Sequence, residues 1–240
     1  MAKTVLVTGS AKGIGRACIT LFAQNGYNVI INYNNSENEA KLLEEEIRNK
    51  YNVDVLAIKC DITNVSEIEN MTNIIIDRFG KIDVLINNAA YACDNYIDDK
   101  TKDEFMKVLE CNVVGTFLVT KYLYKYMDGG TIVNISSTDA VDTYNEISID
   151  YCASKAAVNS LTKTLSLAIK NNKVIGVMPN WVKTESVMEM NSDFLNSELE
   201  RIGQSRLDEP DNVARKIFNI VNDDKIISGS IIRIDGDVMC

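Results

Sequence analysis

Two side chains that could take part in proton transfer lie four positions apart in the sequence: the phenol of Tyr151 and the ammonium group of Lys155. The surrounding residues are typical of a helix, on which positions i and i+4 share a face at about 5–6 Å between Cβ atoms. A nearby cation favours the phenolate, so we expect Lys155 to lower a tyrosine pKa that starts at about 10. Tyr151 could then act as a general acid or base near neutral pH. The spacing alone is common and more often structural, so a chemical role depends on the other motifs of the chain.

The chain contains no histidine. This excludes Ser-His-Asp and Cys-His nucleophiles, an imidazole general base and a histidine-liganded zinc. The six cysteines include no Cys-x-x-Cys pair, so we expect neither a metal site nor a disulfide framework. They are typical of reduced, mostly buried thiols in a cytoplasmic protein.

The 240 residues include 25 basic and 34 acidic side chains, which give a net charge of −9. Nucleic acids and anionic membrane surfaces are bound through basic faces, so neither is an expected partner. The apolar run at the N-terminus is too short for a signal peptide, and no apolar stretch approaches the roughly 20 residues that span a bilayer. A cytoplasmic location is therefore expected.

Glycines follow the first apolar run, Val5 to Val7, at positions 9, 13 and 15. The pattern is Gly-x-x-x-Gly-x-Gly, and a helical segment over about residues 14–24 comes directly after it. Such a turn lets the backbone approach a pyrophosphate, to which the helix N-terminus offers amide groups and a positive dipole. A plain strand-to-helix turn is the alternative, but the position after a strand and before a helix favours a dinucleotide.

The end of the second predicted strand lacks the acidic residue that would bind a ribose 2′-hydroxyl and repel a 2′-phosphate. The chain there contains Tyr33, Asn34 and Ser36, which could supply polar contacts. Lys12, inside the glycine-rich turn, could supply positive charge, although it could also be merely solvated. NADP(H) is therefore favoured over NAD(H).

Short apolar runs alternate with segments of helical periodicity. The predicted strands cover residues 5–7, 29–31, 53–58, 84–86, 131–135, 174–177 and 231–234. The predicted helices cover about residues 14–24, 37–50, 65–79, 101–109, 111–127, 151–170 and 211–222. Continuous β-branched runs are typical of parallel strands buried on both faces, and their alternation with helices predicts βαβ units. We expect one α/β domain over residues 1–240: a Rossmann fold with a doubly wound parallel sheet of about seven strands and helices on both faces.

Residues 180–209 are less regular, and they hold Trp181, Met188 and Met190 among polar side chains. We expect this segment to be an excursion that covers the site.

The combined motifs resemble the short-chain dehydrogenase/reductase family over nearly the whole chain. The matching segments, in the order and at about the spacing of the family, are Thr8–Gly15, Asn87-Asn88-Ala89-Ala90, Asn112, Ile135-Ser136-Ser137, Tyr151-x-x-x-Lys155, Pro179–Thr184 and Ile234-Asp235-Gly236.

The resemblance implies a role for each of four catalytic residues. Tyr151 would donate the proton in reduction and accept it in oxidation, and Lys155 would lower its pKa and hold the nicotinamide ribose. Ser137 would hydrogen-bond the substrate oxygen, although Ser136 could take that place. Asn112 would anchor a water that links Lys155 to solvent, or could instead cap or kink its helix.

The resemblance also implies the residues around NADP(H). Asp61 and Ile62 would lie by the adenine, Asn87 and Ala89 by the adenosine half, and Asn88 would brace the sheet. Val182 and Thr184 would meet the nicotinamide carboxamide. The full predicted cofactor set is Gly9, Ser10, Lys12, Gly13, Ile14, Gly15, Tyr33, Asn34, Ser36, Asp61, Ile62, Asn87, Ala89, Tyr151, Lys155, Val182 and Thr184.

Four features depart from the family pattern. The separation of 14 between Ser137 and Tyr151 is one more than usual, and strict counting would select Thr138. The usual glycine after the motif serines is absent, and the acidic residues Asp139 and Asp142 stand in that region. The usual Pro-Gly is Pro179-Asn180, and the closing motif reads Asp235-Gly236-Asp237.

The bacterial 3-oxoacyl-[acyl-carrier-protein] reductases are the subfamily that the chain most resembles in length and general pattern. The implied reaction is NADPH-dependent reduction of a ketone, with a small-molecule or acyl-thioester substrate, possibly on an acyl carrier protein, in a homotetramer built through the helices of Asn112 and Tyr151. Such carriers are acidic, whereas this chain places Asp128, Asp139, Asp142 and Glu146 near the expected entrance, which disfavours the encounter. A free sugar, hydroxysteroid or other small alcohol or ketone is therefore an alternative, and a non-catalytic NADP(H)-binding sensor is another.

Overall fold

The computed structural model describes residues 2–234, so the closing Asp235-Gly236-Asp237 motif lies outside the described residues. Within that range, seven parallel strands form one sheet in the order β3-β2-β1-β4-β5-β6-β7. The strands are β1 (Thr4–Val7), β2 (Asn28–Tyr33), β3 (Val55–Lys59), β4 (Val84–Asn87), β5 (Thr131–Ile135), β6 (Lys173–Pro179) and β7 (Ile231–Ile234). The predicted doubly wound parallel sheet is confirmed.

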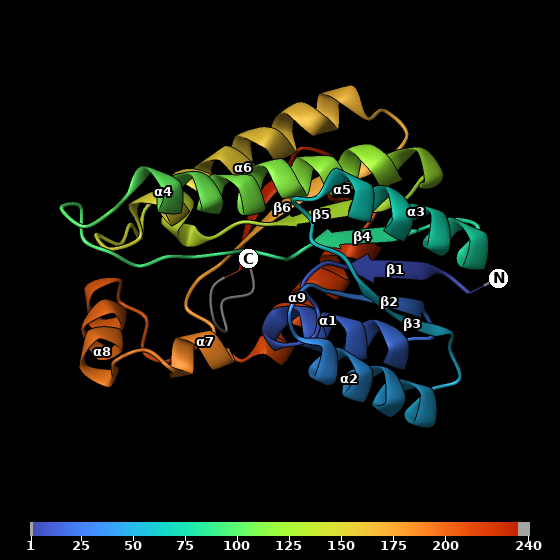
Figure 1. Ribbon diagram of the computed structural model, residues 1–240, viewed down its shortest axis with the longest axis horizontal. Coiled ribbons are helices and arrows are strands. Elements are labelled where there is room, and N and C mark those ends of the chain that lie inside the picture. Colours follow the sequence, from blue (N-terminus) through green and yellow to red (C-terminus); the bar gives the residue numbers. More distant parts are fainter. Residues whose placement is uncertain (1, 235–240) are drawn as a thin grey trace.

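Helices cover both faces of this sheet (Figure 1). One face carries α1 (Gly13–Gln24), α2 (Glu37–Lys50) and α9 (Pro210–Asn222), and the other carries α3 (Val65–Phe79), α4 (Lys102–Leu109), α5 (Thr116–Leu123) and α6 (Ile149–Ala168). The strand order reverses between β1 and β4. In open parallel sheets this reversal opens a crevice at the carboxyl ends of the strands, where ligands bind.

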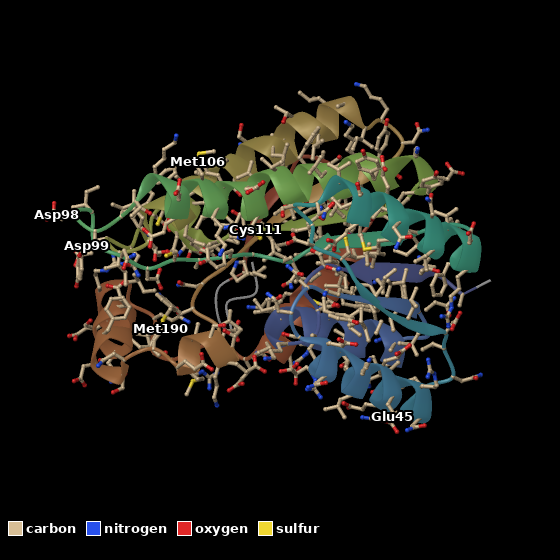
Figure 2. The ribbon with its side chains drawn as sticks, in the orientation of Figure 1. Glu45, Asp98, Asp99, Met106, Cys111 and Met190 are labelled. Carbon is tan, nitrogen blue, oxygen red and sulfur yellow. The ribbon has the colours of Figure 1, made fainter. Side chains whose placement is uncertain are left out.

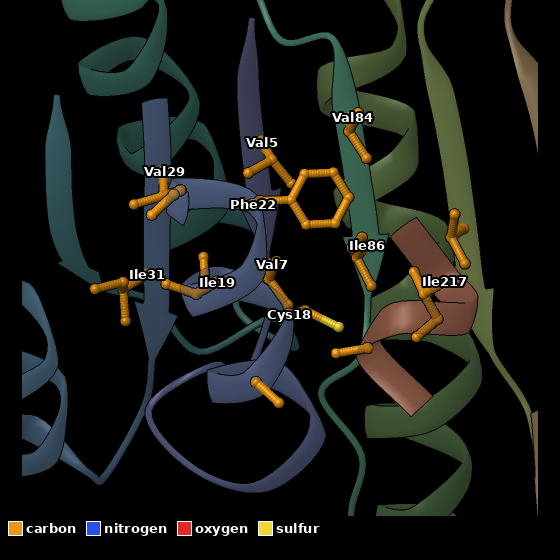
Figure 3. Close-up of a cluster of buried hydrophobic side chains, with 14 of the residues drawn as sticks. Val5, Val7, Cys18, Ile19, Phe22, Val29, Ile31, Val84, Ile86 and Ile217 are labelled. Carbon is orange, nitrogen blue, oxygen red and sulfur yellow. The ribbon is translucent and has the colours of Figure 1, made fainter. Parts of the chain in front are cut away.

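The central strands β1, β4, β5 and β6 are almost entirely buried, and their mostly apolar sequences fit strands that are covered on both faces. On β1, Val5 and Val7 pack with Phe22 of α1, as Figure 3 shows, whereas Leu6 belongs to the cluster on the opposite face. The Phe22 ring also packs edge-on against Phe218 of α9, with ring centroids 5.0 Å apart. These contacts fix α1 on the sheet, and thereby fix the glycine-rich turn that precedes it.

Helices α4 and α5 are joined through a π-helical turn over Glu110–Gly115. The sequence predicted separate helices over 101–109 and 111–127, but the path is continuous and ends in a 3₁₀ turn at Tyr124–Tyr126. Gly115 lies so close to β3's following loop that an added Cβ would come within 2.7 Å of Ile62 Cδ1. Single π turns are frequent at functional sites, and this one contains Asn112.

The excursion over residues 180–209 contains two short helices, α7 (Glu185–Met188) and α8 (Ser192–Arg201), beside the carboxyl ends of the strands (Figure 1). It returns to the body of the protein through a parallel bridge between Val182 and Asp208. The sequence predicted its position but not its helices.

No helix within residues 2–234 combines the length and apolar character needed to cross a bilayer. The cytoplasmic location stays a prediction.

Candidate active site

A cavity of about 860 Å³ runs along the carboxyl ends of the strands, from the glycine-rich turn to Tyr151. It brings together residues that lie far apart in the sequence. The predicted site residues that line it are Gly9, Lys12, Gly13, Ile14, Asn34, Ser36, Asp61, Ile62, Ala89, Ser137, Tyr151, Lys155, Val182 and Thr184. Five predicted site residues do not line it: Ser10, Gly15, Tyr33, Asn87 and Asn112.

The glycine-rich turn presents free amide groups to this cavity. Gly9 and Gly13 adopt φ values of +60° and +54°, which favour glycine. Helix α1 has no side-chain cap at Lys12 and no acidic residue in its first turn, so the first amides have no partner from their own helix. This donor set fits a pyrophosphate, which accepts hydrogen bonds at a positive helix end.

Neighbouring side chains hold the turn in place. Asn32 Oδ1 accepts a hydrogen bond from the Gly9 amide at 3.1 Å, and Asn88 Nδ2 donates to the carbonyl of Thr8 at 2.9 Å. Ser10 Oγ donates to the Val7 carbonyl at 2.8 Å, so this predicted cofactor residue supports the turn from inside. An added Cβ on Gly15 would lie 2.7 Å from Asn88 Nδ2, which explains why glycine is needed there although it does not reach the cavity.

Two of the predicted cofactor residues, Tyr33 and Asn87, have side chains that lie away from the cavity. Tyr33 is buried in the hydrophobic cluster beneath α1 and α2, because Asn32, its neighbour on β2, points to the turn and strand side chains alternate. Asn87 lies inside the protein, where its Nδ2 donates to Asn134 Oδ1 at 2.8 Å and Thr120 Oγ1 at 3.0 Å. Asn87 therefore braces the structure internally, whereas Asn88 holds the turn and lines the cavity.

The end of the cavity beside the loop after β2 is polar, and it is where the sequence predicts the adenosine half of the cofactor. Asn34, Asn35 and Ser36 line it together with Asp61, which accepts a hydrogen bond from Asn34 Nδ2 at 3.0 Å. Lys12 Nζ forms an ion pair at 2.7 Å with Glu39 of α2, and both side chains are exposed. Lys12 thus supplies the positive charge that the sequence predicted at this place, but the carboxylate of Glu39 already pairs with it.

Tyr151 and Lys155 project from α6 into the other end of the cavity. Lys155 Nζ donates to the Ile135 carbonyl at 2.8 Å and lies 5.3 Å from the centre of the Tyr151 ring. Lys155 is 2% exposed, and burial lowers its pKa to about 8. No described residue accepts a hydrogen bond from the Tyr151 hydroxyl, which leaves it available to a ligand.

The expected lowering of the Tyr151 pKa is wrong for the chain alone. Burial raises the pKa of Tyr151, and the carboxylates of Asp139 and Asp94 raise it further. Loss of water around a phenol disfavours the phenolate, and burial is the largest cause of this shift.

The structure distinguishes the three hydroxyl groups that follow β5. Ser136 Oγ donates to the Lys155 carbonyl at 3.0 Å, and the fully buried Thr138 Oγ1 donates to Asn180 Oδ1 at 3.1 Å. Ser137 lines the cavity, and its Oγ accepts a hydrogen bond from the Asp139 amide at 3.1 Å. The geometry therefore favours Ser137 as the hydroxyl that meets a ligand, with the extra residue accommodated in the loop.

Asn112 links three parts of the site without reaching the cavity. Its Nδ2 donates to Ser154 Oγ at 2.9 Å, and its Oδ1 accepts from the Tyr91 amide at 2.7 Å. Ser154 Oγ in turn donates to the Tyr151 carbonyl at 2.7 Å. The π turn thus ties the loop after β4 to the helix of Tyr151, and the predicted water-anchoring role of Asn112 stays a prediction.

Several lining residues were not among the predicted site residues. They include Asp94, Cys111, Asp139, Asn145, Ser148, Asn180, Trp181 and Met190. Cys111 and Met190, labelled in Figure 2, line the cavity from the π turn and from the segment between α7 and α8. Asn145 and Ser148 belong to the irregular loop before α6, where no spacing rule indicates which side chains face inward.

The chain is similar to known proteins over almost its whole length. Residues 3–194 match the family model described as short chain dehydrogenase. The 3-oxoacyl-[acyl-carrier-protein] reductases FabG of Staphylococcus epidermidis and Thermotoga maritima are 31% and 33% identical, with 98% and 99% of this chain and 98% of each relative covered.

Solved structures are similar as well. A dehydrogenase/reductase from Sinorhizobium meliloti has a TM-score of 0.91 at 28% identity, covering 98% of this chain and 95% of that one. A short chain dehydrogenase from Burkholderia cenocepacia in complex with NADP has a TM-score of 0.90 at 27% identity, covering 98% of this chain and 96% of that one. Together with the glycine-rich turn and the Ser-Tyr-Lys set in one cavity, these similarities establish that the chain belongs to the short-chain dehydrogenase/reductase family.

Proposed function

We propose that this chain is an NADP(H)-dependent oxidoreductase that interconverts a ketone and a secondary alcohol. The observation that supports it is the single cavity that joins the phosphate-binding turn to Ser137, Tyr151 and Lys155. A binding protein would need the turn alone, whereas an enzyme needs an acid within reach of the bound substrate.

Each of the three residues has a distinct task in reduction. NADPH, when held along this cavity, would supply the hydride that a carbonyl carbon accepts. The Ser137 and Tyr151 hydroxyls hold the carbonyl oxygen, on which negative charge develops. Tyr151 gives its hydroxyl proton to that oxygen, which completes the alcohol and leaves a phenolate. Lys155 stabilises this phenolate as the nearby cation, and the proton lost is replaced from solvent.

The raised pKa of Tyr151 suits the direction of reduction. It keeps the phenol protonated at neutral pH, as a proton donor must be. Alcohol oxidation requires the phenolate, and it is therefore favoured at higher pH.

The preference for NADP(H) over NAD(H) belongs to the same proposal. Lys12, Asn34, Asn35 and Ser36 line the adenosine end, and a similar solved structure contains NADP. A 2′-phosphate would compete with Glu39 for Lys12, because phosphate is also a strong acceptor for an ammonium group.

Lys12→Gln is expected to weaken NADPH binding about tenfold, the loss of roughly one charge-assisted hydrogen bond, and to leave NADH binding near wild type. Glu39→Gln is expected to tighten NADPH binding, because it removes the internal competitor of the phosphate. Fluorescence titration of each variant with both nucleotides measures these effects. Equal weakening of NADPH and NADH by Lys12→Gln, or tighter binding of NADH by the wild type, would contradict the assignment.

The similar FabG proteins are 3-oxoacyl-[acyl-carrier-protein] reductases, which makes a 3-oxoacyl thioester the first substrate class for this proposal. A second candidate, a free polar ketone or alcohol, is favoured by the carboxylates of Asp94 and Asp139 in the cavity lining. The deciding experiment is a panel of ketones with NADPH and of alcohols with NADP⁺. It includes an acetoacetyl thioester, both free and on an acyl carrier protein. Tight NADPH binding without turnover of any compound would instead support a non-catalytic sensor.

We also propose a homotetramer. Its support is a set of exposed apolar side chains: Val114 on the π turn, Phe117 on α5, Tyr124 in the 3₁₀ turn after α5 and Leu167 at the end of α6. Such a surface is typical of an interface between copies of a chain.

Light scattering after size exclusion is expected to give about four times the mass of one chain. Phe117→Glu is expected to reduce that mass, because it buries a charge in the interface. Leu42→Glu, at an exposed apolar position on α2, is the matched control and should leave the mass unchanged. A monomeric wild type would contradict the proposal.

A further inference from the structure

The loop that follows Ser137 adds a carboxylate to the reaction end of the cavity. Asp139 lies in a 3₁₀ turn over Thr138–Ala140, and its side chain lines the cavity together with Ser137 and Tyr151. Its backbone amide donates to Ser137 Oγ at 3.1 Å. Asp139 is therefore hydrogen-bonded through its backbone to the same Ser137 hydroxyl that is proposed to hold the reacting oxygen of the substrate.

The protein holds this carboxylate without neutralising it. Thr143 Oγ1 donates to Asp139 Oδ1 at 2.6 Å. Arg201 of α8 acts on Asp139 electrostatically, but it is ion-paired with Glu198 at 2.7 Å and donates to the Thr143 carbonyl at 3.2 Å. Burial raises the pKa of Asp139, and the hydroxyls of Thr143 and Ser137 oppose that shift. A partly buried carboxylate without a salt bridge favours a ligand that brings a hydrogen-bond donor.

Asn145 provides an independent indication of a polar ligand. Its side chain is 6% exposed and lines the same cavity. Its Oδ1 accepts from the Ile147 amide at 3.0 Å, whereas no described residue accepts from its Nδ2. The residue is otherwise buried, so a donor at the cavity wall that has no protein acceptor is placed to meet a ligand acceptor.

The charges of the lining residues disfavour a substrate that carries a negative charge, such as a carboxylate or a phosphate. Asp94, which accepts from Ser148 Oγ at 2.5 Å, adds a second carboxylate near Tyr151. Among the described residues that line the cavity, the cations are Lys12 at the adenosine end and Lys155 beneath Tyr151. Lys155 already donates to the Ile135 carbonyl, and no second cation among the described lining residues faces a carboxylate or phosphate at the substrate end.

We propose that Asp139 is a specificity-determining residue that accepts a hydrogen bond from a hydroxyl on the carbon next to the reacting carbon. The substrate class is then an α-hydroxy ketone and the corresponding vicinal diol, with the Asn145 amide as a donor to a further substrate oxygen. This inference rests on the proposed ketone reductase activity. It selects a free polar substrate over an acyl thioester, whose chain has no donor to offer to Asp139.

The test compares 1-hydroxy-2-butanone with 2-butanone, which differ by one hydroxyl group, in steady-state reduction with NADPH by the full chain. The wild type is expected to prefer the hydroxy ketone at least tenfold in kcat/KM, because a site built for a hydroxyl leaves its acceptor unpaired with the analogue. Asp139→Asn is expected to reduce this ratio about tenfold while the Kd for NADPH stays unchanged. Asp139→Ser serves as a second variant if the first does not fold.

The ratio separates recognition from a general effect on the site. Removal of the Asp139 charge also changes the environment of Tyr151, but that change acts on both ketones and cancels in the ratio. Asp142→Asn is the matched control, since Asp142 belongs to the same loop, pairs with Arg233 and does not line the cavity. Its ratio should equal that of the wild type.

Reduction of both ketones at equal kcat/KM by the wild type would overturn the inference and leave the proposed function intact. An unchanged ratio in both Asp139 variants would also overturn it. A clear preference for 1-amino-2-butanone over the hydroxy ketone would overturn the hydroxyl assignment in favour of a cationic substrate. Absence of turnover with every ketone and alcohol, despite NADPH binding, would be the failure of the proposed function itself.

Discussion

Tyr151→Phe is expected to lower kcat for ketone reduction by about 10³-fold, within the range that loss of a general acid produces. The phenylalanine ring fills the same space in the cavity wall, so the Kd for NADPH should stay near that of the wild type. The hydroxyl has no hydrogen-bond acceptor among the described residues, so its removal leaves no protein group unpaired. Single-turnover reduction, monitored by loss of NADPH absorbance, measures the effect on the chemical step.

Tyr144→Phe is the matched control for this substitution. Tyr144 is exposed in the loop before α6 and does not line the cavity, so its variant should reduce ketones at the wild-type rate. If Tyr151→Phe reduced ketones as fast as the wild type, the proposed acid would be wrong. If it lost NADPH binding together with activity, the residue would have to be assigned to binding and not to proton transfer.

Lys155→Met is expected to be inactive and yet more stable than the wild type at pH 7. Burial lowers the pKa of Lys155 to about 8, from 10.5 in the unfolded chain. That difference corresponds to about 3 kcal/mol of destabilisation while the group is charged in both states. Loss of the hydrogen bond to the Ile135 carbonyl offsets about 1 kcal/mol of the gain. The net expectation is a stabilisation of about 2 kcal/mol, at the expense of the cation beside Tyr151.

The stability advantage of Lys155→Met over the wild type should depend on pH. Below pH 8 the lysine is protonated in both the folded and the unfolded chain, so the penalty is fully present. Between about pH 8 and 10.5 the unfolded chain binds more protons than the folded one, so the wild type gains stability as the pH rises. The advantage of Lys155→Met should therefore shrink over that window.

Urea denaturation of both proteins at several pH values between 7 and 10 measures the difference in the free energy of unfolding. Lys163→Met is the control, because Lys163 is an exposed residue on the same helix. Its difference from the wild type should be small and independent of pH. A Lys155→Met protein that is less stable than the wild type at pH 7, or whose advantage does not shrink with pH, would contradict the assigned pKa.

The parts of the fold that the sequence predicted well are those set by local chemistry. The β-branched runs indicate strands that are buried on both faces. The glycines at positions 9 and 13 indicate positive φ values, which other residues rarely adopt. The same holds for Tyr151 and Lys155, because a spacing of four on one helix already places them on a common face.

The sequence did not predict which side of a strand a given side chain faces, because a shift of one residue along the strand reverses the answer. Tyr33 and Asn32 are adjacent on β2, and only the exact alternation determines which of them meets the glycine-rich turn. Asn87 and Asn88 pose the same problem at the end of β4. A shift of one residue exchanges the two faces of a strand, and sequence patterns do not define strand ends that sharply.

The charged groups around Tyr151 could not be predicted from the sequence either. The pair of Tyr151 and Lys155 is local, but Asp94 and Asp139 reach the phenol from loops that are distant in the sequence. Their effect depends on the tertiary fold and on burial, neither of which a spacing on one helix contains.

The contact between Gly13 and Thr184 has a consequence for the redesign of this protein. An added Cβ on Gly13 would lie 3.1 Å from Thr184 Cγ2, at the N-cap of α7 inside the segment over residues 180–209. The glycine-rich turn, proposed to bind phosphate, and the segment predicted to cover the site therefore support each other at one point. On that proposal, a substitution made in the turn to change the nucleotide would also displace the covering segment, so exchange of cofactor and exchange of substrate would not be independent engineering problems in this molecule.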